Sequence, residues 1–325
     1  MRDAFRTVGL ITIVAVYFLI MVGGVVRASG AGMGCPDWPK CFGQWIPPTD
    51  VSQLPANYQE IYKDHGYADA PFNAFKTWTE YVNRLIGVVI GFLIFLTVVC
   101  ASGYWSDKRT ILWLSLAAFI LVGFQGWLGS VVVASNLSPW IITVHMLVAL
   151  IIVGLLITAR AAATALEHDQ PYHPLLGKLL LTCLILSFLQ IALGTHIREA
   201  VDTIALNLGL DRRSEWVGEI GISVLFHRSF SIVILFTNAV AIWLLRKNGP
   251  APGPVAWAGY GILACIVAEI VVGAIMFYAA IPAVLQPVHL LLASVMAGLQ
   301  WYLWIAARNS TSEVVGTIER EAATT

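Results

Sequence analysis

Eight long apolar stretches constrain the fold of this chain of 325 residues more than any other feature of its sequence. Each stretch holds about 20 mostly apolar residues, which is the length that an α-helix needs to cross a bilayer. Because the hydrocarbon core offers no water to backbone polar groups, spans of this length must be helical. We therefore expect an all-α polytopic membrane protein with eight transmembrane helices. The stretches cover residues 8–26, 81–103, 111–133, 140–162, 175–197, 220–245, 255–278 and 283–306.

The charged residues agree with this expectation. They make up 12% of the chain, about half of the share found in a soluble domain, and they gather between the apolar stretches. The formal net charge is zero, so the composition favours membrane lipid over nucleic acid as a partner and leaves the oligomeric state open. The first stretch exceeds the roughly 7–15 apolar residues of a signal peptide, so we expect a retained helix in a bacterial plasma membrane.

Basic residues in the short loops predict the orientation. They lie on one side of the predicted membrane, which the positive-inside rule assigns to the cytoplasm. Both termini are then cytoplasmic, and two longer loops, about 27–80 and 198–219, lie outside. The basic residues concerned are Arg2, Arg6, Lys108, Arg109, Arg160, Lys178, Arg246, Lys247 and Arg308.

The second half of the chain repeats the spacing of the first. Asn83 and His145 have the same separation as His227 and His289, since 145 − 83 and 289 − 227 are both 62. Segments 125–129 and 269–273 keep the same register, and Gly-x-x-x-Arg occurs at both 23–27 and 194–198. We expect two tandem four-helix bundle repeats, residues 1–165 and 166–325, with an expanded outer loop in the first. An even number of helices per repeat gives both copies the same orientation.

The two histidines of the second half form the strongest candidate site. His227 and His289, like Asn83 and His145, lie near the outer starts of their predicted spans. Ionisable side chains in spans usually face the bundle interior and mark function, and bundle cores build cofactor sites from facing helices. Imidazole binds iron, copper and zinc alike. Two imidazoles with no expected Cys, Asp or Glu beside them fit the axial positions of a haem better than a tetrahedral zinc.

Arginines and one glutamate accompany these positions. Arg84 and Arg228 directly follow Asn83 and His227, and they could pair with haem propionates, because guanidinium binds carboxylate in a bidentate way. The alternative is an interfacial arginine that reaches towards lipid headgroups. The same two readings apply to Arg27 and Arg198, at outer helix ends.

Glu80 also has two readings. It lies three residues before Asn83, so it is either a carboxylate that stabilises charge or handles a proton beside a substrate, or a glutamate of a first helical turn.

Other residues on the predicted outer side are weaker candidates. Cys35 and Cys41 flank a five-residue segment of the first outer loop, where oxidising conditions permit a disulfide. His65 lies in that loop, and His196 lies at an outer helix end without a histidine at the matching position of the first half.

Taken in order, these motifs make the chain resemble the haem A synthase family of bacterial and mitochondrial membranes. The resemblance covers nearly the whole chain. It is carried by Gly23–Arg27, Gly30, Gly32, Cys35–Cys41, Glu80–Arg84, Gln125-x-x-Leu-Gly129, His145, Gln190-x-x-Leu-Gly194, His227-Arg228 and His289.

The resemblance implies an enzyme that oxidises the C8 methyl group of haem O to a formyl group, giving haem A. It implies that His227 and His289 bind a cofactor haem b, that His145 binds the substrate haem O, and that Glu80 is catalytic. It also implies a disulfide between Cys35 and Cys41. The expected partners are a haem O synthase and the assembly of haem–copper oxidases.

Asn83 departs from the family pattern, in which Glu-x-x-His-Arg is usual at 80–84. Asparagine is a poor iron ligand, so we expect a substrate haem held mainly by His145, with its sixth position open or closed weakly by water, His65 or His196. Asn83 also supports an alternative function, an electron-transfer cytochrome b that oxidises no haem. A duplicated transporter is a third possibility, but transporters usually carry polar residues at the midplane, whereas here they gather at the outer rim.

Overall fold

The computed structural model describes residues 1–164, 172–209, 211–247 and 253–324, with side chains described as far as Arg308. Within these ranges the chain forms helices and no strands, and eight helices are long and apolar enough to cross a membrane. The predicted all-α membrane fold is confirmed. The eight are α1 (Arg2–Ala28), α3 (Ala74–Ala101), α4 (Arg109–Ala134), α5 (Pro139–Ala163), α6 (Leu176–Leu208), α8 (Ile222–Lys247), α9 (Gly253–Tyr278) and α10 (Leu285–Thr324).

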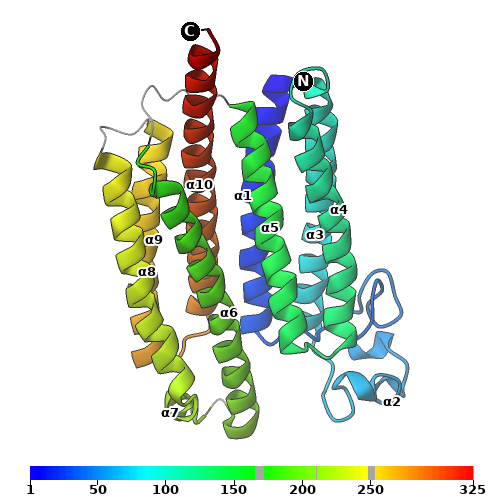
Figure 1. Cartoon of the computed structure of the whole chain (residues 1–325). Helices are drawn as coiled ribbons and strands as arrows, with labels where there is room; N and C mark the ends of the chain where they lie inside the picture. The colour runs from blue at the N-terminus through cyan, green and yellow to red at the C-terminus, as the bar shows by residue number, and fades with distance from the viewer. Residues whose placement is uncertain (165–171, 210, 248–252, 325) are drawn as a thin grey trace.

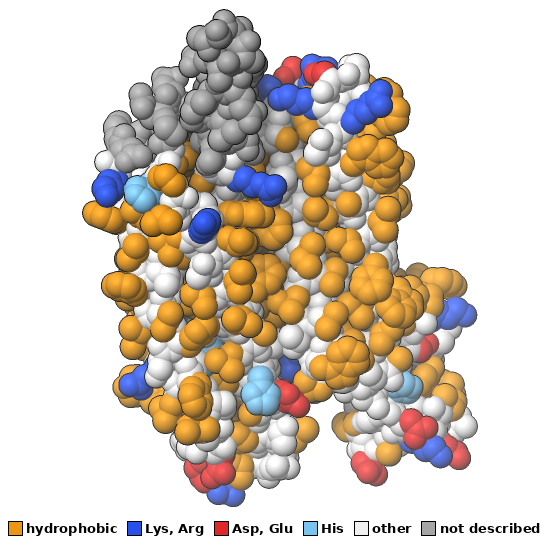
Figure 2. All heavy atoms as spheres, in the orientation of Figure 1, with side chains coloured by type: hydrophobic (Ala, Val, Ile, Leu, Met, Phe, Trp, Pro, Cys, Tyr) orange, Lys and Arg blue, Asp and Glu red, His pale blue; other side chains and the backbone are white. Residues whose placement is uncertain are grey.

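The helices stand side by side, and both ends of the chain lie at one end of the bundle (Figure 1). The opposite end, called here the loop end, carries residues 29–73 and the short helix α7 (Trp216–Glu219). Large apolar side chains such as Phe92 and Phe236 are exposed on the helix surfaces. They form a broad band between charged residues that gather towards the two ends of the visible face (Figure 2). A band of this kind suits lipid, not water.

Several helix boundaries differ from those predicted: α1 begins at Arg2 and not at 8, and α10 ends at Thr324 and not at 306. Two further differences have a cause in the structure. α3 begins at Ala74, not at 81, because the side chain of Asn73 accepts a hydrogen bond from the N–H of Lys76 and caps the helix. The predicted outer loop 198–219 is wrong for its first half, since α6 continues to Leu208 and ends at Gly209, whose φ is +72°. Val201 on this extension packs against Trp216, and that burial stabilises the additional helical turns.

The two halves pack in the same way. In the first, α1 contacts α3, α3 contacts α4, α4 contacts α5, and α5 returns to α1; in the second, α6, α8, α9 and α10 close an equivalent ring. This order fits the expected tandem repeat, although the expected boundary at 165/166 lies outside the described residues. In each ring the helices that carry the candidate ligands, α3 with α5 and α8 with α10, occupy diagonal corners.

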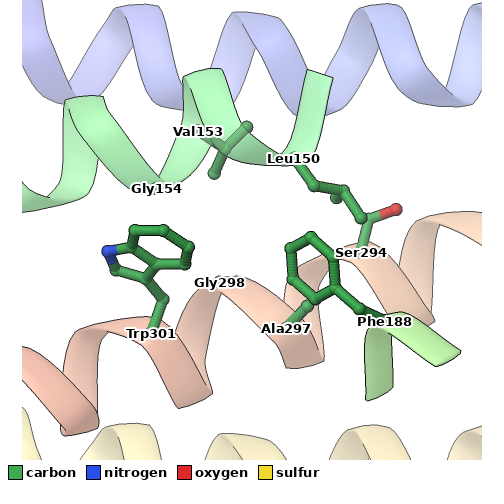
Figure 3. Close-up of a pocket in the computed structure, with 8 residues that line it drawn as sticks. All are labelled: Leu150, Val153, Gly154, Phe188, Ser294, Ala297, Gly298 and Trp301. Carbon is green, nitrogen blue, oxygen red and sulfur yellow. The ribbon is translucent and has the colours of Figure 1, made fainter. Parts of the chain in front are cut away.

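α10 joins the halves, since it contacts α1 and α5 of the first as well as α6 and α9 of the second. Gly154 of α5 lies against the indole ring of Trp301, whose Nε1–H donates to Thr158 Oγ1 at 2.9 Å. The cavity beside them, which Figure 3 shows between Trp301 and Phe188, measures about 10 Å³. That volume is at the lower limit for one water molecule. The junction is therefore close-packed around Gly154 and Trp301.

A buried polar pair distinguishes the two halves. Gln300 of α10 donates through Nε2 to Oδ1 of Asn238 of α8 at 2.9 Å, and both residues are almost fully buried. The residues 144 positions earlier are Ile94 and Leu156, which lie in the apolar core of the first half. The same place in the two bundles is therefore filled once by an amide pair and once by an aliphatic pair.

This difference predicts a result for three variants. Gln300→Leu alone strands the carbonyl of Asn238 and should lower the free energy of unfolding by about 1 kcal/mol, the size of an interhelical hydrogen bond in a membrane. Asn238→Ile with Gln300→Leu copies the aliphatic pair of the first half and should recover most of that loss. Reversible unfolding in mixed detergent micelles measures both. If the loss of unfolding free energy in the double variant equals the sum of the losses in Asn238→Ile and Gln300→Leu, the interpretation is contradicted.

Candidate haem-binding site

His227 and His289 face each other across the second bundle. His227 lies five residues into α8 and His289 four residues into α10, so both sit within about 10 Å of the loop-end starts of their helices at 1.5 Å per residue. Their ring centroids are 6.2 Å apart, with an interplanar angle of 62°. The pairing expected from the sequence spacing is present.

The spacing of the two rings fits one metal ion between them. With metal–nitrogen bonds of about 2 Å on each side, two axial imidazoles have centroids about 6 Å apart. Among the described residues, no group of three or more His, Cys, Asp or Glu side chains could hold a metal ion, so a tetrahedral zinc site has no ligand set here. Two opposed imidazoles suit a haem iron, whose other four ligands come from the porphyrin.

Two helix hairpins position a histidine through the same pair of contacts. Gln125 of α4 donates through Nε2 to the backbone carbonyl of His145 at 2.8 Å, and Gln190 of α6 donates in the same way to His227 at 2.9 Å. Four residues after each glutamine, Gly129 or Gly194 leaves room for Cε1 of the same histidine ring. The Gln-x-x-x-Gly motif therefore fixes the depth of one histidine on the neighbouring helix. The sequence showed the motif but not this role.

The hairpin of α9 and α10 changes one part of this device. Gly273 lies beside Cε1 of His289 as expected, but the glutamine position holds Glu269, whose Oε2 lies 2.5 Å from Nδ1 of His289. The expectation that no acidic residue accompanies the histidine pair is therefore wrong. Residues 269 and 289 are 20 apart in the sequence, on different helices, so only the hairpin geometry reveals the contact.

The hairpin of α1 and α3 lacks both the glutamine and the histidine of this arrangement. Leu19 stands where Gln190 stands in the second half, 171 residues later, while Gly23 matches Gly194. Asn83, the residue at the ligand position, has a buried Oδ1 without a hydrogen-bond partner. His145 lies on the diagonal helix, and its Nδ1 is also buried without a partner. The first bundle thus offers one histidine and one unpaired amide where the second offers two histidines.

Glu80 and Arg84 lie beneath the outer segment, defined as residues 29–73. Glu80 is 4% exposed, accepts the N–H of Cys35 at 2.8 Å through Oε2, and forms an ion pair with Arg84 through Oε1. Arg84 also donates to the backbone carbonyls of Cys35, Asp37 and Lys40 at 2.7–3.1 Å. Glu80 is therefore a buried carboxylate inside α3 and not a first-turn residue. Arg84 is engaged with the outer segment.

The outer segment folds around its disulfide. Cys35 and Cys41 are bonded and fully buried, as the resemblance implied. Phe42 makes edge-to-face contacts with four rings nearby: Tyr58, Tyr62, Tyr67 and Phe72. Burial, with a smaller effect of the Glu80 charge, raises the pKa of Tyr67 above its ordinary value, so its hydroxyl stays a donor to the carbonyls of Met33 and Gly34.

The remaining arginine candidates have protein partners. Arg27 of α1 and Arg198 of α6 both pair with Asp202, in the case of Arg27 at 2.7 Å. This cluster links the two halves at the loop end. The guanidinium of Arg228 lies 5.8 Å from the centroid of the Phe277 ring. The propionate-binding role of these arginines remains a prediction.

The two additional histidines are engaged away from Asn83. Nδ1 of His65 lies 3.2 Å from Oδ1 of Asn136. Nδ1 of His196 lies 3.5 Å from a carboxylate oxygen of Glu199, and the His196 side chain is 67% exposed. Neither contact involves the ligand positions.

Comparisons with known proteins identify the family of the chain. The model of the COX15-CtaA family, described as cytochrome oxidase assembly protein, matches residues 6–300 of the chain. The chain belongs to this haem A synthase family. The match includes all four ligand positions, Glu80 and the outer segment.

Several relatives within the haem A synthase family align over most of their length. A protein named heme A synthase from Shewanella oneidensis is 28% identical over 238 residues, which cover 70% of this chain and 69% of the relative. The heme A synthase of Bartonella bacilliformis is 27% identical over 316 residues, covering 87% and 86%. That of Shouchella clausii is 25% identical, covering 76% and 78%.

The contacts of Arg84 predict how the outer segment responds to mutation. Arg84→Ala removes three hydrogen bonds to backbone carbonyls, each worth about 1.5 kcal/mol or more because the donor is charged. Amide hydrogen exchange over residues 35–43 should quicken at least tenfold. The matched control is Arg228→Ala, 144 positions later and in contact with Phe277, which should leave this exchange unchanged. Equal exchange in both variants would contradict the role given to Arg84.

Proposed function

We propose that this protein is a haem A synthase that oxidises the C8 methyl group of haem O to a formyl group. Membership of the family and the names of the relatives support the activity. The observation that carries the proposal is the opposed pair His227 and His289 in one bundle, with a single histidine and a buried carboxylate in the other. One bundle is suited to a permanent haem and the other to a haem that must be bound, oxidised and released.

His227 and His289 would hold haem b in the second bundle. Their rings face each other at a suitable separation, and Nδ1 of His227 is buried without a partner. When bound, haem b supplies one-electron transfer, and the protein supplies position and electrostatics. Gln190 and Gly194 fix the depth of His227, and Gly273 makes room for the ring of His289.

His145 and Glu80 would serve the substrate haem O in the first bundle. His145 is anchored by Gln125 through its backbone, so the imidazole ring is left available for the substrate iron. Glu80 is held by Arg84 and the N–H of Cys35. A fixed carboxylate can stabilise positive charge that develops on the substrate, or accept a proton from it. With water as the oxygen source, the methyl group and one water yield the formyl group and release four protons and four electrons. The electrons pass to an external electron acceptor and the protons to solvent.

The sequence and the family support a setting for the proposed reaction. The positive-inside rule assigns the end with the termini to the cytoplasm, so the ligand positions and the outer segment lie towards the outer face of a bacterial plasma membrane. A haem O synthase would supply the substrate, and the assembly of a haem–copper oxidase would take the product, in keeping with the description of the family.

Haem extraction tests the activity directly. In cells that also express a haem O synthase, the wild-type chain should yield haem A on chromatography. His145→Ala should abolish it, and Glu80→Gln should lower it at least a hundredfold, the size of a lost proton-transfer or charge-stabilising group. Both variants should retain haem b, because its proposed ligands lie in the other bundle. Haem b and haem O without haem A, in well-folded wild-type protein, would contradict the proposal.

Asn83 supports one alternative, an electron-transfer cytochrome b that carries haem only in the second bundle. The two functions differ in the first bundle, where the synthase needs haem O to bind at His145. We predict that wild-type protein loaded with haem O shows a high-spin component in resonance Raman spectra, because Asn83 supplies no sixth ligand. Asn83→His with Leu19→Gln copies the second-half hairpin and should convert this component to low spin. A purely low-spin wild-type spectrum with haem O bound would contradict the open position.

A further inference from the structure

Glu269 is a carboxylate within a membrane span, at a position where the other polar hairpins hold glutamine. Its side chain is 15% exposed, and its Oε2 lies 2.5 Å from Nδ1 of His289. Charged side chains in spans are costly and persist where they are paired and functional. Gln125 and Gln190, by contrast, bond to backbone carbonyls of their histidines and leave the rings untouched. Among the three histidines at candidate ligand positions, His289 is therefore the one whose ring has a carboxylate partner.

The partner of one ring nitrogen controls what the other nitrogen does. A histidine that binds a metal usually donates its second N–H to a carboxylate or carbonyl, and this bond fixes the tautomer, orients the ring and makes the ligand more basic. With Glu269 at Nδ1, the proton of a neutral His289 belongs on Nδ1 and Nε2 is left for a metal ion. Nδ1 of His227 is also buried without a hydrogen-bond partner, but it has no contact like that between His289 and Glu269 in the described part of the chain. The two proposed axial ligands are thus chemically unequal.

Glu269 and His289 are close enough for a hydrogen bond, but their atoms are not aligned for one. Nδ1 of His289 and Oε1 of Glu269 both lack a well-aligned hydrogen-bond partner, although Nδ1 and Oε2 are 2.5 Å apart. Rotation of the imidazole about its Cβ–Cγ bond changes the direction of the N–H without moving either helix. A hydrogen bond between them therefore requires only a side-chain adjustment.

We propose that Glu269 is a positioning residue for His289, and that its carboxylate lowers the midpoint potential of the haem b held by His227 and His289. This inference rests on the proposed function, since it needs a haem at that pair. The redox couple takes up one electron, with no bond made or broken. The ferric form carries one more positive charge than the ferrous form, so a nearby carboxylate and a more basic imidazole both stabilise the ferric form. The acidic residue would make this haem a poorer electron acceptor than one held by histidines anchored only by glutamine.

Redox titration of the haem-loaded full chain in detergent tests this inference. Glu269→Gln installs the residue of the other hairpins and should weaken the preference for ferric over ferrous haem about tenfold, which raises the midpoint potential by ~59 mV for one electron. The g-values of the low-spin ferric signal in electron paramagnetic resonance should shift with it. Glu269→Asp, with a shorter reach, should give an intermediate potential.

Gln190→Leu is the matched control. It removes a hydrogen bond to the backbone carbonyl of His227, and leucine already occupies the corresponding position 19 of the first half. Its midpoint potential should move by less than a third of the shift in Glu269→Gln. A shift as large as that of Glu269→Gln would show that any disturbance of the hairpin changes the potential, which would overturn the specific role of Glu269.

The remaining outcomes separate the inference from the proposed function. A low-spin Glu269→Gln protein with unchanged potential overturns the inference and leaves the histidine pair as haem ligands. Low-spin haem that survives both His227→Ala and His289→Ala overturns the ligand assignment and the inference together. If Glu269→Gln binds too little haem to titrate, Glu269→Asp decides: a raised potential supports the inference, and the wild-type potential overturns it.

Discussion

Polar groups in the hydrocarbon core must be satisfied by the protein or by something bound to it, because no water is present there. In this chain that constraint governs the ends of the helix hairpins. An amide from one helix bonds to the backbone carbonyl of a histidine on the next, which ties the two helices together at a defined depth. Nδ1 of His145 and Nδ1 of His227 remain buried without partners. The fold thus positions imidazoles accurately while leaving their metal-binding capacity unused by the protein.

The two halves differ in the residues at these glutamine and histidine positions. The second half has histidines at both candidate ligand positions and adds a carboxylate to one of them. The first half replaces one histidine by Asn83 and the matching glutamine by Leu19, while the outer segment brings Glu80 and Arg84 into contact with Cys35. Two identical halves would have two equal sites. Under the proposed function, these few differences suit one site to a fixed redox group and the other to a substrate.

Much of the fold could be predicted from the sequence, because lipid imposes a length and an apolarity that are visible in each span. The approach of His227 to His289 could be expected from a spacing shared by both halves, while their role as haem ligands remains a prediction. Boundaries were less accessible: Asn73 caps α3 early, and α6 extends past its apolar stretch because Val201 is buried against Trp216. Two contacts depend on tertiary packing and cannot be read from a local sequence pattern. They are the contact of Glu269 with His289 and the hydrogen bonds of Arg84 to the outer segment.

We propose that the two bundles offer unequal haem sites, one with two histidine ligands and one with a single histidine. Electron paramagnetic resonance of the oxidised full chain, loaded with haem b and haem O and quantified for spin, distinguishes the two sites. We expect one low-spin haem, lost in His227→Ala and His289→Ala, and one high-spin haem, lost in His145→Ala. Two low-spin haems per chain, or a low-spin signal that does not depend on His227 and His289, would contradict it.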